Sequence, residues 1–156
     1  RDLSEIEDKL EEMGLSLPEP PSPLANYVPA LVSGNLVFLS GHIPRHTDGS
    51  FVTGKLGEEY SAEQGYDLAR QVALTLISSL KKVSGDLDNI KRIIRVTCMV
   101  NAIPTFTQHS AVANGVSDLL VNLWGESGMH TRIAAGMGSL PGGVPVEIEM
   151  IVELFS

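Results

Sequence analysis

Six residues of this 156-residue sequence could together form a site for a small carboxylic acid. An arginine presents a planar fork of N–H donors that can grip a carboxylate with two hydrogen bonds. A glutamate close to it can hold or activate a water molecule. All six are expected near strand ends, where they would suit a small 2-keto or 2-imino acid. They are Tyr27, Ser40, Gly41, Asn101, Arg132 and Glu147.

The last quarter of the chain carries the two charged members of this set. Residues 144–155 alternate with a period of two, which is typical of a strand with one apolar face. The opposite face carries three carboxylates, including that of Glu147. The Gly/Pro-rich turn at residues 138–143 predicts that residues 133–137 fold back against this strand as a hairpin. Such a hairpin would bring Arg132 near Glu147 on one sheet face.

Each of these residues also has an interpretation without a ligand. Carboxylates on exposed strands are common, so Glu147 can belong to a solvated face and Arg132 to an ordinary surface ion pair. Tyr27 and Ser40 can be structural residues. The residue types alone leave both interpretations open.

The start of the chain predicts an amphipathic helix followed by a stiff connector. Apolar residues recur at spacings of three and four over residues 3–13, with Ser4 or Asp2 as the N-cap. Residues 15–23 contain four prolines and cannot form a helix. We expect residues 1–23 to be an accessory element on a domain formed by residues 24–156.

Five strands and two helices are predicted for this domain. The strands are expected at residues 28–33, 36–40, 93–100, 133–137 and 144–155, and the helices at residues 61–83 and from Pro104 to about Trp124. This ββαβαββ order predicts an α/β (α+β) class, with two helices on one face of a mixed sheet. The other face would expose apolar side chains beside charged groups, namely Ile93, Met99, Ile151 and Phe155. We therefore expect an oligomer, with polar pockets where the sheets meet.

Composition excludes several classes of function. The chain carries 11 basic and 19 acidic residues, a net charge of −8 that repels a phosphate backbone, so no nucleic-acid partner is expected. The histidines have no metal-ligand spacing, so no metal site is expected. No apolar run approaches the length of a membrane span, and no targeting signal is visible. Cys98 is the only cysteine, which favours a reducing compartment, and we expect a cytoplasmic protein.

At these residues the sequence resembles the RidA/YjgF family of reactive-intermediate deaminases, some of whose members carry the label endoribonuclease L-PSP. The resemblance covers residues 27–154 in the family's order and spacing. Its motifs are Asn26-Tyr27-Val28, Leu39-Ser40-Gly41-His42-Ile43-Pro44, the strand 96–100 running into Asn101, Thr131-Arg132, Leu140-Pro141 and Val144-Pro145-Val146-Glu147-Ile148-Glu149.

The resemblance implies a chorismate-mutase-type fold that assembles as a homotrimer, with the sheets forming a central barrel and three pockets at the interfaces. Arg132 then matches the arginine that grips the substrate carboxylate, and Glu147 the acid that orients the hydrolytic water. Tyr27, Ser40 and Gly41 match pocket-lining positions. The implied reaction is hydrolysis of a 2-enamine or 2-imino acid to a 2-keto acid and ammonia, without metal or cofactor.

The sequence also departs from the family pattern. A cysteine often found two residues after the arginine is Ala134 here, and residues 1–23 and the loop at residues 45–57 are distinctive. The chain therefore resembles a longer, divergent subgroup. Two other functions stay open: a non-catalytic trimer that binds keto acids, and an endoribonuclease, against which the charge of −8 argues.

Overall fold

The computed structural model describes residues 4–22 and 25–156, which form one five-stranded sheet covered by helices. The main helices are α1 (Glu5–Glu12), α2 (Ala62–Ser84) and α3 (His109–Trp124), and short 3-10 turns lie at Leu87–Asn89 (η1), Gly125–Gly128 (η2) and Pro141–Gly143 (η3). The strands are β1 (Ala30–Ser33), β2 (Leu36–His42), β3 (Ile90–Asn101), β4 (Thr131–Met137) and β5 (Val146–Leu154). The predicted order of elements is confirmed. None of the helices in the described part of the chain has the length and apolar character of a membrane span.

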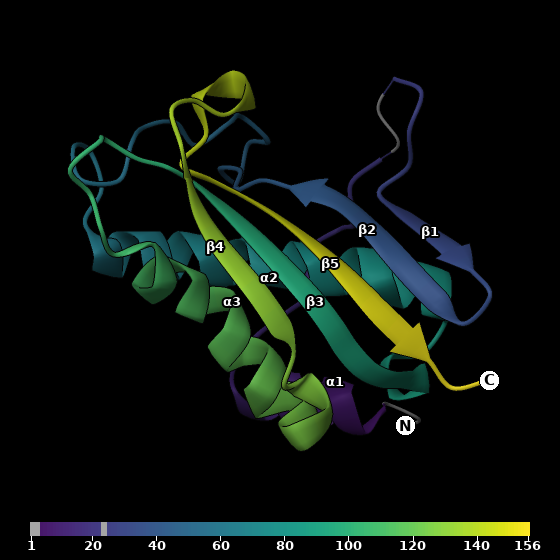
Figure 1. Ribbon diagram of the computed structural model, residues 1–156. Helices are drawn as coiled ribbons and strands as arrows, with labels where there is room; N and C mark the ends of the chain where they lie inside the picture. The colour runs from purple at the N-terminus through teal and green to yellow at the C-terminus, as the bar shows by residue number, and fades with distance from the viewer. Residues whose placement is uncertain (1–3, 23–24) are drawn as a thin grey trace.

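The sheet has the strand order β1-β2-β5-β3-β4 and is mixed. β3 and β4 are parallel, whereas all other neighbours are antiparallel. Figure 1 shows α2 and α3 side by side behind the sheet, which leaves the opposite face toward the viewer. The predicted arrangement of two helices on one face of a mixed sheet is therefore confirmed.

The predicted hairpin between residues 133–137 and the last strand is wrong. β4 pairs in parallel with β3, so that Arg132 lies opposite Val96, and β5 inserts between β2 and β3. Helix α3 is the crossover that makes this possible, because two parallel strands need a connection of about a dozen or more residues. The turn at residues 138–143 thus carries the chain across β3 and does not close a hairpin.

Two further boundaries differ from the prediction. Helix α3 begins at His109 and not at Pro104, since the backbone before it turns outward: Ile103 N donates to Leu56 O at 3.1 Å. A residue before proline is also disfavoured in helical conformation. Ile93 is fully buried, although strict alternation placed it on the open face. The register of β3 shifts by one residue between Ile93 and Arg95, and this irregularity turns Ile93 toward the helices.

Helix α2 forms as its sequence predicts. Ser61 accepts a hydrogen bond from the Gln64 backbone at 3.2 Å, while the Gln64 side chain accepts one from the Ser61 backbone at 2.8 Å. This reciprocal capping box fixes the first turn. Gly85 ends the helix with a φ of 79°, a conformation that favours glycine. The rigid α2 forms one wall of the cavity described below.

The N-terminal helix α1 is packed into the core. Ser4 caps it, accepting a hydrogen bond from Glu7 N at 3.0 Å, while the alternative cap Asp2 lies outside the described residues. Ile6 and Leu10 are buried within the main apolar cluster. The carboxylate of Asp88 accepts hydrogen bonds from the backbone N–H groups of Glu5 and Ile6, at 2.9 and 3.2 Å. Burial and hydrogen bonding together anchor the start of the chain.

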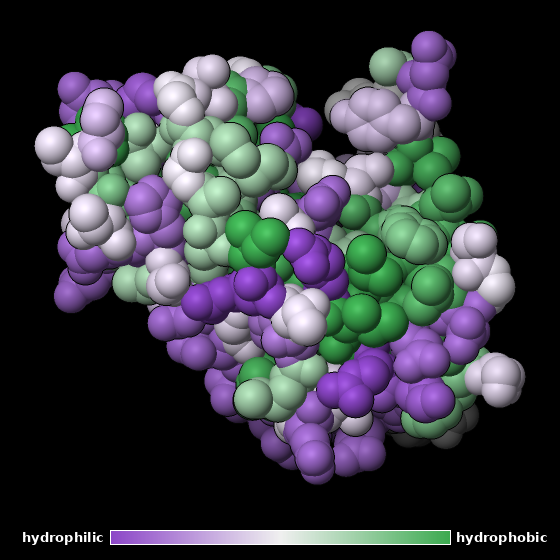
Figure 2. Space-filling model, in the orientation of Figure 1, coloured by the Kyte–Doolittle hydropathy of each residue, from purple (hydrophilic) through white to green (hydrophobic). Residues whose placement is uncertain are grey.

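The open face of the sheet exposes apolar side chains beside charged ones. Leu31, Phe38 and Ile133 are 59, 42 and 47% exposed, and register places all three on the face away from the helices. Figure 2 shows hydrophobic surface over this face next to strongly hydrophilic groups. A face of this composition is typical of one that a second subunit covers.

Candidate functional site

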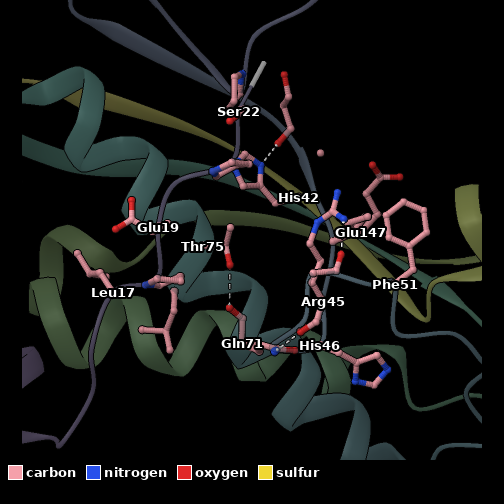
Figure 3. Close-up of a pocket in the computed structure, with 18 of the residues that line it drawn as sticks. Leu17, Glu19, Ser22, His42, Arg45, His46, Phe51, Gln71, Thr75 and Glu147 are labelled. Carbon is pink, nitrogen blue, oxygen red and sulfur yellow. Dashed lines mark hydrogen bonds between the residues drawn. The ribbon is translucent and has the colours of Figure 1, made fainter. Parts of the chain in front are cut away.

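A cavity of about 760 Å³ opens beside β2 and β5. Three segments form its walls: the connector at residues 16–22, the loop at residues 45–51 and the middle of α2. Figure 3 shows side chains from all three converging on one space, with Glu147 on its strand side. Four of the six predicted site residues line this cavity: Tyr27, Ser40, Gly41 and Glu147.

Glu147 is the half-buried carboxylate of this cavity. It lies opposite Met99 in the sheet, on the face away from α2 and α3, between the buried Val146 and Ile148. Burial raises the pKa of Glu147 above its usual range, and the nearby charge of Glu149 raises it further. A carboxylate with a raised pKa is a better proton acceptor near neutral pH.

Gly41 makes room for this carboxylate. A methyl group at position 41 would overlap the carboxylate oxygen Oε2 of Glu147, and it would also crowd Cδ and Cγ of that side chain. The backbone conformation of Gly41 is not left-handed, so space and not strain explains the glycine. The Ser40-Gly41 motif therefore positions Glu147 sterically.

Both the side chain and the backbone of Ser40 make hydrogen bonds within the protein. Its hydroxyl donates to Val28 O at 2.6 Å, and its carbonyl accepts from Nδ1 of His42 at 2.6 Å. Because Nδ1 of His42 donates, Nε2 is the acceptor of the Ser79 hydroxyl at 2.7 Å. Burial lowers the pKa of His42, against the smaller opposing effect of the Ser40 hydrogen bond, so the ring is neutral near pH 7. The sequence pattern did not reveal a role for His42, and the structure shows that it supports Ser40.

Arg132 lies away from this cavity. Its Nη1 atom donates to Asn114 Oδ1 at 2.8 Å and to Ser117 Oγ at 3.1 Å, both on α3. The side chain therefore lies on the helix side of the sheet, whereas Glu147 lies on the other side. The predicted juxtaposition of Arg132 and Glu147 within one chain is thus wrong, because it depended on the hairpin.

A small hydrogen-bonded network orients Arg132. Nδ1 of His130 donates to Gly128 O at 2.6 Å, which leaves Nε2 to accept from the Ser117 hydroxyl at 2.8 Å. Burial lowers the pKa of His130; its hydrogen bond to Gly128 O opposes this, and the charge of Arg132 lowers the pKa further. Ser117 is thereby left to accept from Arg132. This network holds the guanidinium at the β4 edge.

Asn101 is also separate from the cavity, and it is buried at the end of β3. Its side-chain oxygen accepts from Lys55 Nζ at 2.7 Å, and its amide nitrogen donates to Val144 O at 3.1 Å. Lys55 Nζ donates in addition to Gly138 O at 2.7 Å. Asn101 thus ties the loop of Lys55 to the strand ends, a structural role that composition did not reveal.

The described residues hold no cluster of three or more histidine, cysteine or acidic side chains suited to a metal ion. Cys98 is buried under the helices, and burial raises the pKa of its thiol to about 12, although the charge of Arg132 opposes this. A thiol with so high a pKa is not a nucleophile at neutral pH.

Both the fold and these motifs define the class of protein. The family model described as "YjgF/chorismate mutase-like, putative endoribonuclease" matches residues 7–155, and the chain belongs to this family. The resemblance drawn from the sequence is confirmed, and so is the chorismate-mutase-like fold. The match includes most of α1, which lies before the stretch on which the resemblance rested.

Individual relatives cover nearly the whole chain. Protein TCP17 of Trypanosoma cruzi is 40% identical over 146 residues, which are 93% of this chain and 91% of that protein. The structure of Atu1372 from Agrobacterium tumefaciens has a TM-score of 0.88 at 38% identity, covering 97% of this chain and 93% of the other. A protein from Shewanella oneidensis MR-1, named "putative endoribonuclease", has a TM-score of 0.90 at 32% identity, covering 96% and 99%.

Proposed function

We propose that this protein hydrolyses small 2-enamine or 2-imino acids to 2-keto acids and ammonia. The observation that carries the proposal is the half-buried Glu147, whose pKa is raised and whose carboxylate lies against Gly41 in an open cavity. A carboxylate of this kind is suited to take a proton from water. Family membership supports the same chemistry, and we expect a cytoplasmic enzyme that acts on a small carboxylated metabolite.

The reaction needs only proton transfers and one water molecule. An enamine first takes a proton at its terminal carbon and loses one from its nitrogen, which converts it into the imine. Glu147 then accepts a proton from water as the oxygen attacks the imine carbon, and the imine nitrogen gains a proton. In the carbinolamine that results, the hydroxyl proton is transferred to the amino group, which leaves as ammonia and gives the 2-keto acid. Glu147 returns to its charged form, so the cycle closes without an oxidant.

We further propose that the carboxylate of the substrate is held by Arg132 of a second subunit in a homotrimer. Within one chain the guanidinium of Arg132 and the carboxylate of Glu147 lie on opposite sides of the sheet. Arg132 is on the edge strand β4, and the open face carries exposed Leu31, Phe38 and Ile133. Covering this face with further copies would bury apolar surface and bring one copy's β4 edge to another's cavity.

The decisive experiment is ammonia release from freshly generated 2-iminopropionate by the wild type and by Glu147→Gln. We expect rapid release by the wild type and loss of at least two orders of magnitude in the variant, as for removal of a general base. Tight binding of pyruvate without ammonia release would instead make the protein a keto-acid binding module. Cleavage of RNA by protein freed of contaminating nuclease would favour the third function, against which the charge of −8 argues.

A further inference from the structure

We propose that the cavity holds a second kind of ligand, an amphipathic monocarboxylate, with its carboxylate on Arg45 and its apolar chain between the connector and α2. This inference goes beyond the proposed deamination, because it needs neither Arg132 nor a second subunit. It concerns two walls of the cavity to which the proposed deamination assigns no role, the connector at residues 16–22 and the loop at residues 45–51.

The size of the cavity is the first argument. A volume of about 760 Å³ far exceeds that of pyruvate or its imine. Proteins enclose drug-sized ligands in cavities of about 300–1,000 Å³, so this cavity has room for a much longer molecule. A small 2-imino acid at Glu147 would leave most of the space near the connector filled only by water.

Arg45 provides an oriented cation on the cavity wall. Its Nη1 atom donates to Gly49 O at 2.9 Å, and its guanidinium carbon lies 4.8 Å from the centre of the Phe51 ring. The Arg45 backbone is fixed as well, since Gln71 Nε2 donates to Arg45 O at 2.8 Å. Figure 3 shows the Arg45 side chain between Gln71 and Glu147.

Arg45 has no anionic partner among the residues that the structure describes. Among residues 4–22 and 25–156, no carboxylate lies within ion-pair distance of its guanidinium. Within the described part of the chain, only one of its N–H groups makes a hydrogen bond, to Gly49 O, so the others are available for the two oxygens of a carboxylate. Because the guanidinium of Arg45 is already stacked on the Phe51 ring, its side chain loses little rotamer freedom when it binds a carboxylate.

The remaining walls favour an apolar chain. Five apolar residues also line the cavity: Leu17, Pro18, Pro21, Ile43 and Leu74. The connector is held in place, because the hydroxyl of Ser78 on α2 donates to Pro18 O at 2.5 Å. Prolines restrict its backbone further, so this wall is preformed. An alkyl or aromatic chain leaving Arg45 would therefore bury its surface against α2 and the connector.

Charge restricts the ligand to one carboxylate. Glu19 and Glu147 also line the cavity, at its connector side and its strand side. A second anionic group placed beyond Arg45 would lie near one of these carboxylates and be repelled. Dicarboxylates are therefore disfavoured, and the expected class is a monocarboxylic acid with an unbranched or aromatic tail.

Calorimetric titration with acetate, hexanoate, octanoate and decanoate tests the proposal on the intact protein. We expect affinity to rise about threefold to fourfold for each added methylene, as apolar surface is buried, until the cavity is filled. Arg45→Gln should weaken octanoate binding about tenfold or more, and Arg45→Lys should recover only part of it. Thr75→Trp, which fills the cavity from α2, should remove the dependence on chain length.

Two matched arginine variants complete the design, with melting curves to confirm folding. Arg70→Gln removes an arginine of α2 that does not line the cavity and should bind octanoate like the wild type. Arg132→Gln should also bind octanoate normally while it loses deamination. The proposal would be overturned if octanoate binding were unaffected by Arg45→Gln but weakened by Arg132→Gln. It would also be overturned if affinity did not change from acetate to decanoate. Failure of deamination alone would leave it standing, so the two proposals fail separately.

Discussion

At the scale of single residues, the carboxylate of Glu147 makes the stability of the folded protein depend on pH. Its pKa is raised in the folded protein by burial and by Glu149, so folding favours its protonated form. The stabilising effect is fully present below the pKa of the unfolded chain and is lost as the pH rises through the folded pKa. At neutral pH the charged Glu147 therefore lowers stability.

We predict that Glu147→Gln has a melting temperature equal to or higher than that of the wild type at pH 7 and that this difference disappears at acidic pH. Turnover should nevertheless fall at least a hundredfold at pH 7, because the amide cannot accept the proton. Thermal melts at pH 4 and pH 7 and ammonia assays on the same samples measure both effects. A variant that is destabilised at pH 7 with unchanged turnover would show that Glu147 is a structural residue.

Gly41→Ala tests the same carboxylate through its neighbour. The added methyl group would overlap the end of the Glu147 side chain, which is flexible enough to move away. We therefore expect a stability loss of about 1 kcal/mol or less together with a loss of activity of about tenfold or more. Gly34→Ala is a poor control because Gly34 has a φ of 62°, whereas Gly138→Ala meets no atom and has no positive φ. The Gly138→Ala control should retain full activity.

Arg132→Lys tests whether the substrate carboxylate needs the planar guanidinium or only a positive charge. The planar fork cannot be replaced by an ammonium group, so we expect a loss of about 2–4 kcal/mol in transition-state stabilisation. A ligand-binding arginine without a partner in the protein would change stability very little when replaced. The hydrogen bonds from Arg132 to Asn114 and Ser117 revise this to a cost of about 1 kcal/mol. Full activity with a large drop in melting temperature would make the arginine structural.

At the scale of elements, sequence patterns specified local structure better than strand pairing. The Ser61–Gln64 capping box and the Gly34-Asn35 turn act within a few residues, and they start α2 and connect β1 to β2 in a hairpin. The parallel pairing of β4 with β3 depends on contacts made through α3. The shift of register near Ile93 is likewise a property of the whole sheet. Neither leaves a periodic signal in the sequence.

The candidate site was predictable to the extent that its residues lie on neighbouring strands. Ser40, Gly41 and Glu147 meet because β2 and β5 are adjacent. Arg45 was missed because it lies in a polar loop, and the hydrogen bond that fixes its backbone comes from Gln71 on α2, elsewhere in the chain. Only the tertiary structure shows that this loop faces the connector.

Helix α1 offers a test of how far the N-terminal segment contributes to the core. Leu10 is only 3% exposed within the main apolar cluster, so Leu10→Ala should lower the free energy of unfolding by about 2–4 kcal/mol. The exposed Glu12 on the same helix provides the control Glu12→Ala, which should change it by less than about 0.5 kcal/mol. Chemical denaturation measures both. Deletion of residues 1–23, which the sequence suggested to be an accessory element, is expected to lower stability as well, because it removes Ile6 and Leu10 from the core.

At the scale of the whole molecule, the separation of Arg132 from Glu147 leads to the strictest prediction. If each site takes Glu147 from one subunit and Arg132 from a neighbour, then neither Arg132→Lys nor Glu147→Gln protein has an intact site. Unfolding and refolding an equal mixture would form mixed trimers in which some sites draw both wild-type residues from different chains. Random mixing gives about one intact site in four, because each of the two residues is present with a chance of one half.

We therefore predict that the refolded mixture regains about a quarter of the wild-type rate of ammonia release, whereas each variant refolded alone stays inactive. A double variant carrying both changes, mixed with either single variant, should restore nothing and serves as the control for refolding. Sedimentation equilibrium should show trimers in every sample, and Phe38→Glu on the open face should shift them toward monomers and abolish the recovery. A mixture that stays inactive while its trimers form normally would place both residues of each site on one chain, and the arrangement across subunits would then be wrong.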